Sequence, residues 1–173
     1  TYTILDNDAA PVVDFNAASS SGDAGVASAA LQVDLSAVSG LDVSVDYAVT
    51  GTATGGGVDY TLANGTLTIS AGDATDNITI AGIIDDLLDE LDETVVVTLS
   101  NPVNATLGVD NIHTYTILDN DAAPSIDFNA ASSSGDEGVA SAALQVDLSA
   151  VSGLDVSVDY AVTGTATDGG VDY

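Results

Sequence analysis

Hydrophobic and polar residues alternate along most of the chain with a period of two. Leu31, Val33 and Leu35, for example, are separated by Gln32 and Asp34. This alternation is typical of strands with one buried and one exposed face, whereas an amphipathic helix repeats its apolar residues every three or four positions. The pattern, interrupted by Gly, Asn, Asp and Ser, predicts seven short strands, at residues 12–15, 31–35, 43–49, 67–69, 78–84, 95–99 and 115–117.

Seven alternating strands without a convincing helix indicate an all-β protein. The fold that we predict is an immunoglobulin-like, seven-stranded antiparallel β-sandwich. The segment 85–93 is the best helical candidate, but it is acidic and has few apolar residues, so we expect a loop there.

The chain also contains a long internal repeat. Residues 1–60 recur as residues 114–173, which gives a repeat of 113 residues, and this length fits a whole small domain. The two copies differ at four positions, where Val12, Val13, Ala24 and Gly55 are replaced by Ser125, Ile126, Glu137 and Asp168. A turn with proline at 119–124 marks a boundary. We therefore expect residues 1–10 to be the last strand of a preceding repeat, 11–121 a complete domain, and 122–173 the N-terminal part of the following repeat.

The charge of the chain excludes several classes of partner. It has 27 acidic residues, neither Lys nor Arg, and a formal net charge of −27. Binding to the phosphates of nucleic acids requires cationic side chains, so we expect no nucleic acid partner. No apolar run approaches the length of a transmembrane helix, so we also expect no membrane insertion. Such an acidic chain repels itself unless cations neutralise it, which makes a bound metal ion the missing component that the charge favours.

The predicted strand order brings acidic loops together. If successive strands alternate in direction, the loops after the first, third and fifth strands share one end of the domain with the end of the seventh strand. These loops carry Asp23, Asp59 and the acidic residues of 85–93, and the last strand ends at Asp119-Asn-Asp121. Carboxylates in flexible loops suit Ca²⁺, which accepts about 6–8 oxygen ligands, better than Mg²⁺, which demands octahedral geometry. The alternative is a solvated acidic surface that binds no ion.

Other chemistry has little support in the sequence. Zinc would need His or Cys ligands, and the only candidate, His113, has no partner at a motif spacing, so we expect it to be a strand or loop histidine. The adjacent carboxylates Asp85 and Asp86 do not flank a cleft as a glycosidase pair does. We therefore expect no enzyme activity.

Several motifs, in order along the repeat, resemble those of the Calx-beta domain family. They are Gly51-Thr-Ala-Thr-x-Gly-x-x-Asp-Tyr60, Gly65-Thr-Leu-Thr-Ile-x-x-Gly72, Ile83-Ile-Asp-Asp-x-x-x-Glu-x-Asp-Glu93, Leu99-Ser-Asn-Pro102 and Tyr115-Thr-Ile-Leu-Asp-Asn-Asp121. The resemblance implies an immunoglobulin-like sandwich that binds several calcium ions at one end. Domains of this family occur as regulatory domains of sodium–calcium exchangers and as tandem arrays in bacterial surface and adhesion proteins.

The resemblance also implies a set of metal ligands. Carried over by motif position, the ligands and their equivalents in the flanking partial repeats are Asp59, Asp85, Asp86, Glu90, Asp119, Asp121, Glu137, Asp172, Asp6 and Asp8. This chain departs from the family pattern at Ala24, which stands where the following repeat has Glu137. We therefore expect one calcium site of the first domain to be weaker or missing, unless Asp23 takes the place of the absent carboxylate. Asn120 and Leu87 likewise stand where some members have another Asp.

Together these observations lead to a functional hypothesis. We expect a calcium-binding structural repeat of a long extracellular fibre, matrix or adhesin protein, in which calcium between domains stiffens the array. Its partners would be neighbouring repeats of the same chain and identical chains in a filament. A chain without Cys, Met, Lys or Arg resists oxidation and tryptic cleavage, which favours an extracellular or cell-surface location. The alternatives are a calcium-sensing regulatory domain and a carbohydrate-binding module of a surface protein.

Overall fold

The computed structural model describes residues 1–3, 5, 7–136 and 138–166. The chain divides into two compact units, Thr1–Asp86 with Leu91–Asn120, and Leu87–Glu90 with Asp121–Tyr173. The described residues form strands and loops and contain no helix. Consequently, this part of the chain has no helix that is long and apolar enough to cross a membrane.

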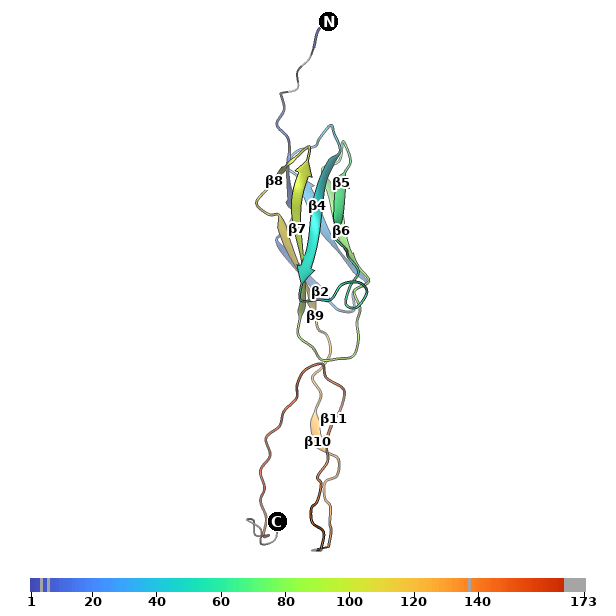
Figure 1. Cartoon of the computed structure of the whole chain (residues 1–173), viewed down its shortest axis with the longest axis vertical. Helices are drawn as coiled ribbons and strands as arrows, with labels where there is room; N and C mark the ends of the chain where they lie inside the picture. The colour runs from blue at the N-terminus through green and yellow to red at the C-terminus, as the bar shows by residue number, and fades with distance from the viewer. Residues whose placement is uncertain (4, 6, 137, 167–173) are drawn as a thin grey trace. The chain divides into compact units, whose positions relative to one another are not determined.

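The first unit is a sandwich of two sheets (Figure 1). Its strands are β1 (Val12–Phe15), β2 (Ser19–Asp23), β3 (Ser28–Leu35), β4 (Val43–Gly51), β5 (Gly65–Ile69), β6 (Thr75–Ala81), β7 (Glu93–Val103), β8 (Thr106–Leu107) and β9 (Ile112–Leu118). One sheet has the order β6-β3-β1-β8, and the other has the order β2-β9-β7-β4-β5. This confirms the predicted all-β, immunoglobulin-like sandwich.

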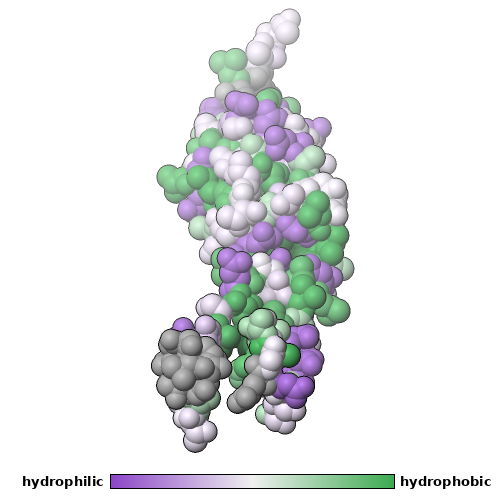
Figure 2. All heavy atoms as spheres, turned by 60° about the horizontal axis from the view of Figure 1, so that its bottom comes forward, coloured by the Kyte–Doolittle hydropathy of each residue, from purple (hydrophilic) through white to green (hydrophobic). Residues whose placement is uncertain are grey.

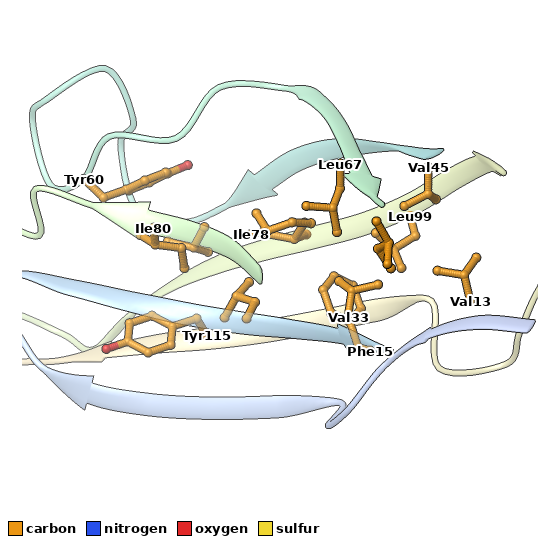
Figure 3. Close-up of a cluster of buried hydrophobic side chains, with 14 of the residues drawn as sticks. Val13, Phe15, Val33, Val45, Tyr60, Leu67, Ile78, Ile80, Leu99 and Tyr115 are labelled. Atoms are coloured by element: carbon orange, nitrogen blue, oxygen red, sulfur yellow. The ribbon is translucent and has the colours of Figure 1, made fainter. Parts of the chain in front are cut away.

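The alternation of the sequence explains how the two sheets pack. The inward side chains of β3 (Leu31, Val33 and Leu35) are buried, and they face inward residues of the second sheet such as Val97 and Leu99. Figure 3 shows the cluster to which they belong, with Val33 and Leu99 near each other, Tyr60 and Tyr115 at one end and Val13 at the other. Burial of such aliphatic and aromatic side chains, each about 1.5–3 kcal/mol, is the main stabilising contribution to the fold.

Two strands were not predicted. The first, β2, consists of Ser19-Ser-Ser-Gly-Asp23 and pairs in parallel with β9, after the chain has left the sheet that contains β1. Its composition matched a turn because it lacks the apolar alternation by which strands are recognised. The second, β8, has two residues and pairs in parallel with β1. The first unit therefore has nine strands, not seven.

The predicted strand 78–84 was too long. The strand β6 ends at Ala81, and Gly82 has a φ of 55°, which turns the backbone out of the extended conformation. This turn changes the phase of the pattern, so Ile83 is 7% exposed and packs in the core while Ile84 is 47% exposed. The prediction that Ile84 continues the buried face was wrong.

The second unit repeats the beginning of the first. Its strands are β10 (Ile126–Phe128) and β11 (Val146–Leu148), which pair antiparallel with Phe128 opposite Val146. The equivalent residues of the first unit, Phe15 and Val33, are paired in the same way. Hydrogen bonds are also repeated, because Asn129 donates to Asp147 as Asn16 does to Asp34. The near-identical sequences thus specify the same local pairing in both units.

Candidate functional site

The strand directions bring four segments to one end of the first unit. The parallel strands β2 and β9 both end there, at Asp23 and Leu118. The strand β7 is antiparallel to β9 and begins there, and β4 is antiparallel to β7 and ends there. We call this end the acidic pole; within the first unit it comprises the loops 24–27 and 52–64, residues 82–86 and 91–92, and Asp119 and Asn120. The face of the molecule that Figure 2 shows carries interspersed hydrophilic and hydrophobic residues.

Asp59 closes the 52–64 loop on itself. Its carboxylate Oδ2 accepts a hydrogen bond from the Thr54 amide at 2.5 Å, and its own amide donates to the Thr54 carbonyl at 3.0 Å. The Asp59 carbonyl accepts a hydrogen bond from Ile84 in the 82–92 loop, also at 3.0 Å. Gly56 and Gly57 have φ values of 79° and 89°, which L-residues rarely adopt, and they allow this tight path. Asp59 therefore has a structural role in addition to any role as a ligand.

Asp85 lies close to the loop that follows β2. A Cβ atom placed on Gly25 would be 3.8 Å from Asp85 Oδ2 and 3.6 Å from Asn120 Nδ2. The amide of Ala24 donates to the carbonyl of Leu118 at 2.9 Å, which ties the same loop to the end of β9. Asp86 follows Asp85 directly in this loop. The structure therefore brings the loops at Ala24 and Asp85 next to the residues that follow β9.

Asp119 is fixed by a residue that the sequence did not single out. Its amide donates a hydrogen bond to Asp92 Oδ1 at 3.1 Å. Asp92 belongs to the acidic 85–93 segment, whose composition predicted a cluster but not which of its carboxylates would reach β9. The signal that could have identified Asp92 is its place next to the first residue of β7, the strand that pairs with β9.

The charged side chains at the acidic pole are all negative, because the chain has no Lys or Arg. Burial raises the pKa of Tyr60, and the neighbouring Asp59 carboxylate raises it further. Burial likewise raises the pKa of Tyr115, with a smaller contribution from Asp23. Both tyrosines therefore remain protonated and neutral at neutral pH, and they add no charge to the acidic pole.

The donor chemistry of the acidic pole fits a hard cation such as Ca²⁺. Asp59, Asp85, Asp86 and Asp119 supply carboxylate oxygens from three different segments, which is the ligand type that Ca²⁺ prefers. Across the described residues, no three His, Cys, Asp or Glu side chains already form a group that could hold a metal ion. Binding by these carboxylates would therefore require the loops to draw their side chains together around the ion.

The other predicted ligands lie elsewhere. Glu90 and Asp121 belong to the second unit. Asp8 precedes β1, whose first residue is at the opposite end of the sandwich from the acidic pole. Asp6, Glu137 and Asp172 lie outside the described residues. Of the ten predicted ligands, the acidic pole of the first unit thus contains Asp59, Asp85, Asp86 and Asp119.

Comparison with known proteins identifies the family. The sequence profile of the Calx-beta domain matches residues 6–121 and again residues 119–173. The chain is similar to the crystal structure of the apo-form Calx CBD1 domain, with 27% identity, a TM-score of 0.58, and coverage of 64% of this chain and 98% of that one. It is also similar to the calcium binding domain CBD12 of CALX1.1, with 28% identity, a TM-score of 0.58, and coverage of 68% and 48%.

Further comparisons support the fold alone or find nothing. A putative carbohydrate binding protein from Bacteroides ovatus ATCC 8483 shares 18% identity, with a TM-score of 0.52 and coverage of 69% of this chain and 40% of that one. The chain spans about half the length of the CBD12 structures that it matches. No curated protein matches the chain. Because the family profile matches nearly the whole chain, this protein belongs to the Calx-beta domain family.

Proposed function

We propose that this chain is a non-catalytic, calcium-binding structural repeat of a long extracellular or cell-surface fibre, matrix or adhesin protein. The observation that carries the proposal is the convergence of carboxylates from separate loops at the acidic pole, in a chain without a single Lys or Arg. Asp59, Asp85, Asp86 and Asp119 would hold the ion there, and Ca²⁺ would supply the positive charge that the chain lacks. The similarity to proteins described as calcium-binding domains supports this assignment.

The mechanical part of the proposal follows from where the chain leaves the sandwich. The strand β9 ends at the acidic pole, and the short segment 119–124 leads from there into residues 122–173. Carboxylates that are crowded without counter-charge repel each other, which keeps such a segment mobile. Calcium bound at this end would remove the repulsion and restrict the motion of the linker. Neighbouring repeats would then be the first partners, and identical chains in a filament a further one.

Thermal unfolding of the 173-residue chain in chelator and in millimolar calcium tests the binding. An ion that binds only the native state stabilises it by RT ln(1 + [L]/Kd), about 2.7 kcal/mol when calcium exceeds Kd 100-fold. Magnesium at equal ionic strength is the control for general screening. An identical melt in all three buffers would exclude a calcium site.

The stiffening is tested separately by distances between spin labels. The chain has no native cysteine, so Thr79→Cys on β6 and Ala150→Cys beyond β11 give two unique labelling positions. The proposal expects a broad distribution of label distances in chelator and a narrow one in calcium. If the distance distribution stays broad in calcium while the melting temperature rises, calcium binds but does not stiffen the linker. Sedimentation of the chain with and without calcium tests filament formation.

A second candidate is a calcium-sensing regulatory domain, which the similarity to the Calx calcium-binding domains favours. A sensor must change shape on binding, because a ligand shifts only equilibria between states to which it binds with different affinity. Two labels within the first unit, at Thr79→Cys and Thr98→Cys, report such a change. The structural role would be favoured if calcium leaves the distance within the unit unchanged and narrows the distribution of distances between the labels at Thr79→Cys and Ala150→Cys.

A further inference from the structure

The serine-rich strand β2 has few side chains that could hold it in place. Its residues are exposed except for the partly buried Gly22, and it contributes no apolar side chain to the core. Strands are normally stabilised by burial of side chains on one face and by cross-strand pairs. Nevertheless, β2 pairs with β9 from Ser19 opposite Thr114 to Asp23 opposite Leu118. Its attachment must therefore depend on the backbone and on contacts that come from β9.

His113 on β9 supplies two of these contacts. The side chain is 4% exposed and is the buried polar residue of the described core. Its Nδ1 lies 2.6 Å from the carbonyl oxygen of Ala17, and because a carbonyl only accepts, this nitrogen carries the hydrogen. Its Nε2 lies 2.7 Å from Ser20 Oγ, so in the neutral ring the serine hydroxyl donates to it.

The partners of His113 lie where the chain crosses between the two sheets, so this side chain can hold the crossing in place. Ala17 precedes β2 and Ser20 lies within it, at the point where the chain crosses from the sheet of β1 to the sheet of β9. The imidazole also packs against Phe15 at the end of β1, with ring centroids 5.4 Å apart and an interplanar angle of 55°. One side chain therefore joins both strands on either side of the crossing to β9.

The strand that His113 fixes leads directly into the acidic pole. Ala24 follows the last residue of β2 and is bonded to the end of β9, and the backbone at Gly25 passes beside Asp85 and Asn120. A β2 that detaches from β9 would carry this loop away from Asp85. The order of the 24–27 loop thus depends on an attachment that is made by the buried side chain of His113.

We infer that His113 is a positioning residue for the acidic pole: it clamps β2 to β9 and thereby holds the 24–27 loop against Asp85. The inference rests on the proposed calcium site, whose affinity it would raise by keeping the loop in place before the ion arrives. The hydrogen bonds of the His113 ring go to Ala17 and Ser20 and not to a carboxylate of the acidic pole, so its effect on the pole is indirect.

Three variants of the full 173-residue chain test this inference. Ser20→Ala removes one hydrogen bond of the clamp without changing the core, and His113→Phe removes both while keeping a ring in place. His113→Gln is the conservative variant, because its amide can donate to Ala17 and accept from Ser20. Ser21→Ala is the matched control, since it removes a hydroxyl from the same strand at the next, exposed position.

Hydrogen exchange in calcium-free buffer measures the clamp itself. Amides of residues 19–25 should exchange about 2- to 12-fold faster in Ser20→Ala, the factor expected for the loss of one hydrogen bond, while those of β3 and β7 keep their rates. The effect should be larger in His113→Phe, restored in part in His113→Gln, and absent in Ser21→Ala. If His113→Phe does not fold, Ser20→Ala still decides the question.

Exchange of the same variants in calcium measures the coupling, and a calcium titration gives the Kd that sets its size. If the ion binds only while β2 is attached, calcium at 100 times its Kd should slow the exchange of residues 19–25 about 100-fold, in the unmodified chain and in Ser20→Ala alike. Unchanged exchange in Ser20→Ala would overturn the clamp, whether or not calcium binds. If the chain binds calcium but the exchange of residues 19–25 does not slow in calcium, the positioning role would be overturned. Absence of calcium binding in the unmodified chain would refute the proposed function, and with it this role of His113, while exchange still reports on the clamp.

Discussion

The most informative perturbation of the acidic pole is Ala24→Glu, because the change has opposite effects with and without calcium. Ala24 follows β2, and its backbone is fixed by the hydrogen bond to Leu118. The neighbouring Gly25 passes close to Asp85 Oδ2. A glutamate at position 24 therefore adds a negative charge beside an existing one. The following repeat carries Glu137 at the equivalent position, so the substitution is one that the same sequence context accommodates.

The magnitudes can be worked out from this geometry. Ala24 is partly buried against the core, so two carboxylates about 6 Å apart there repel by at least about 0.7 kcal/mol, the value for bulk water. Without calcium, the variant should therefore be less stable than the unmodified chain by at least that amount. With calcium, a new charged ligand should contribute about 1–3 kcal/mol, which corresponds to roughly 5- to 150-fold tighter binding. In saturating calcium this gain exceeds the repulsion, so the variant should be the more stable protein.

Chemical unfolding in chelator and in calcium, together with calorimetric titration at constant ionic strength, measures both effects. Ala30→Glu is the matched control, because Ala30 is exposed on β3 and the substitution adds the same charge on a sheet face. The expected result is a reversal of the stability order between the two buffers for Ala24→Glu alone. A change of the same sign in both buffers, or the same reversal in Ala30→Glu, would refute the assignment of this loop position to the calcium site.

Three further predictions concern Asp59, the core and the buried tyrosines. Asp59→Asn should weaken calcium binding but keep the bond to Thr54, whereas Asp59→Ala should also cost about 0.5–1.5 kcal/mol of calcium-free stability; equal calcium-free stabilities would contradict the loop-closing role. Leu99→Ala should lower the unfolding free energy in urea by about 2–5 kcal/mol, and a loss well below that range would mean that the core is looser than described. The pKa values of Tyr60 and Tyr115 are raised above 10.0, so the unfolded chain ionises first, and stability should be fully present below pH 10.0 and fall as the pH rises above it. The double variant Tyr60→Phe, Tyr115→Phe should flatten this alkaline slope, and an unchanged slope would assign it to other groups.

The fold could be predicted where the inward positions of a strand are large and apolar. The strand β3 alternates Leu and Val with polar residues, and β7 buries Val95, Val97 and Leu99 at every second position, so these strands were recognised. The strand β2 was missed because its inward positions, Ser20 and Gly22, are small. The space over them is filled by side chains of β9: the imidazole of His113 reaches Ser20, and a Cβ atom at Gly22 would collide with the Tyr115 hydroxyl. Because side chains of β9 fill the core beside β2, the sequence of β2 itself lacks the apolar pattern by which a strand is recognised.

The site could be predicted only as far as the direction of the strands determines it. Alternating strands place the acidic loops at one end of the domain, whichever residues they contain. The particular contacts depend on backbone geometry: Gly82 decides that Ile83 faces inward, and Asp92 rather than a neighbouring acid accepts from Asp119. Because the 85–93 segment is rich in chemically equivalent carboxylates, composition alone could not select among them.

The donors that hold individual carboxylates indicate what a cation would do at the acidic pole. On the sheets the donors are mixed: the side chains of Thr66 and Asn101 donate to Asp46 and hold its pKa below the usual value, whereas Asp14 accepts from the backbone amide of Asp110. At the acidic pole, the donors to Asp59 and Asp92 are backbone amides of the pole itself. The position of each carboxylate there is thus tied to the path of its loop. An ion that draws these carboxylates together must therefore also order the loops, so calcium would act on the shape of this end of the sandwich as well as on its charge.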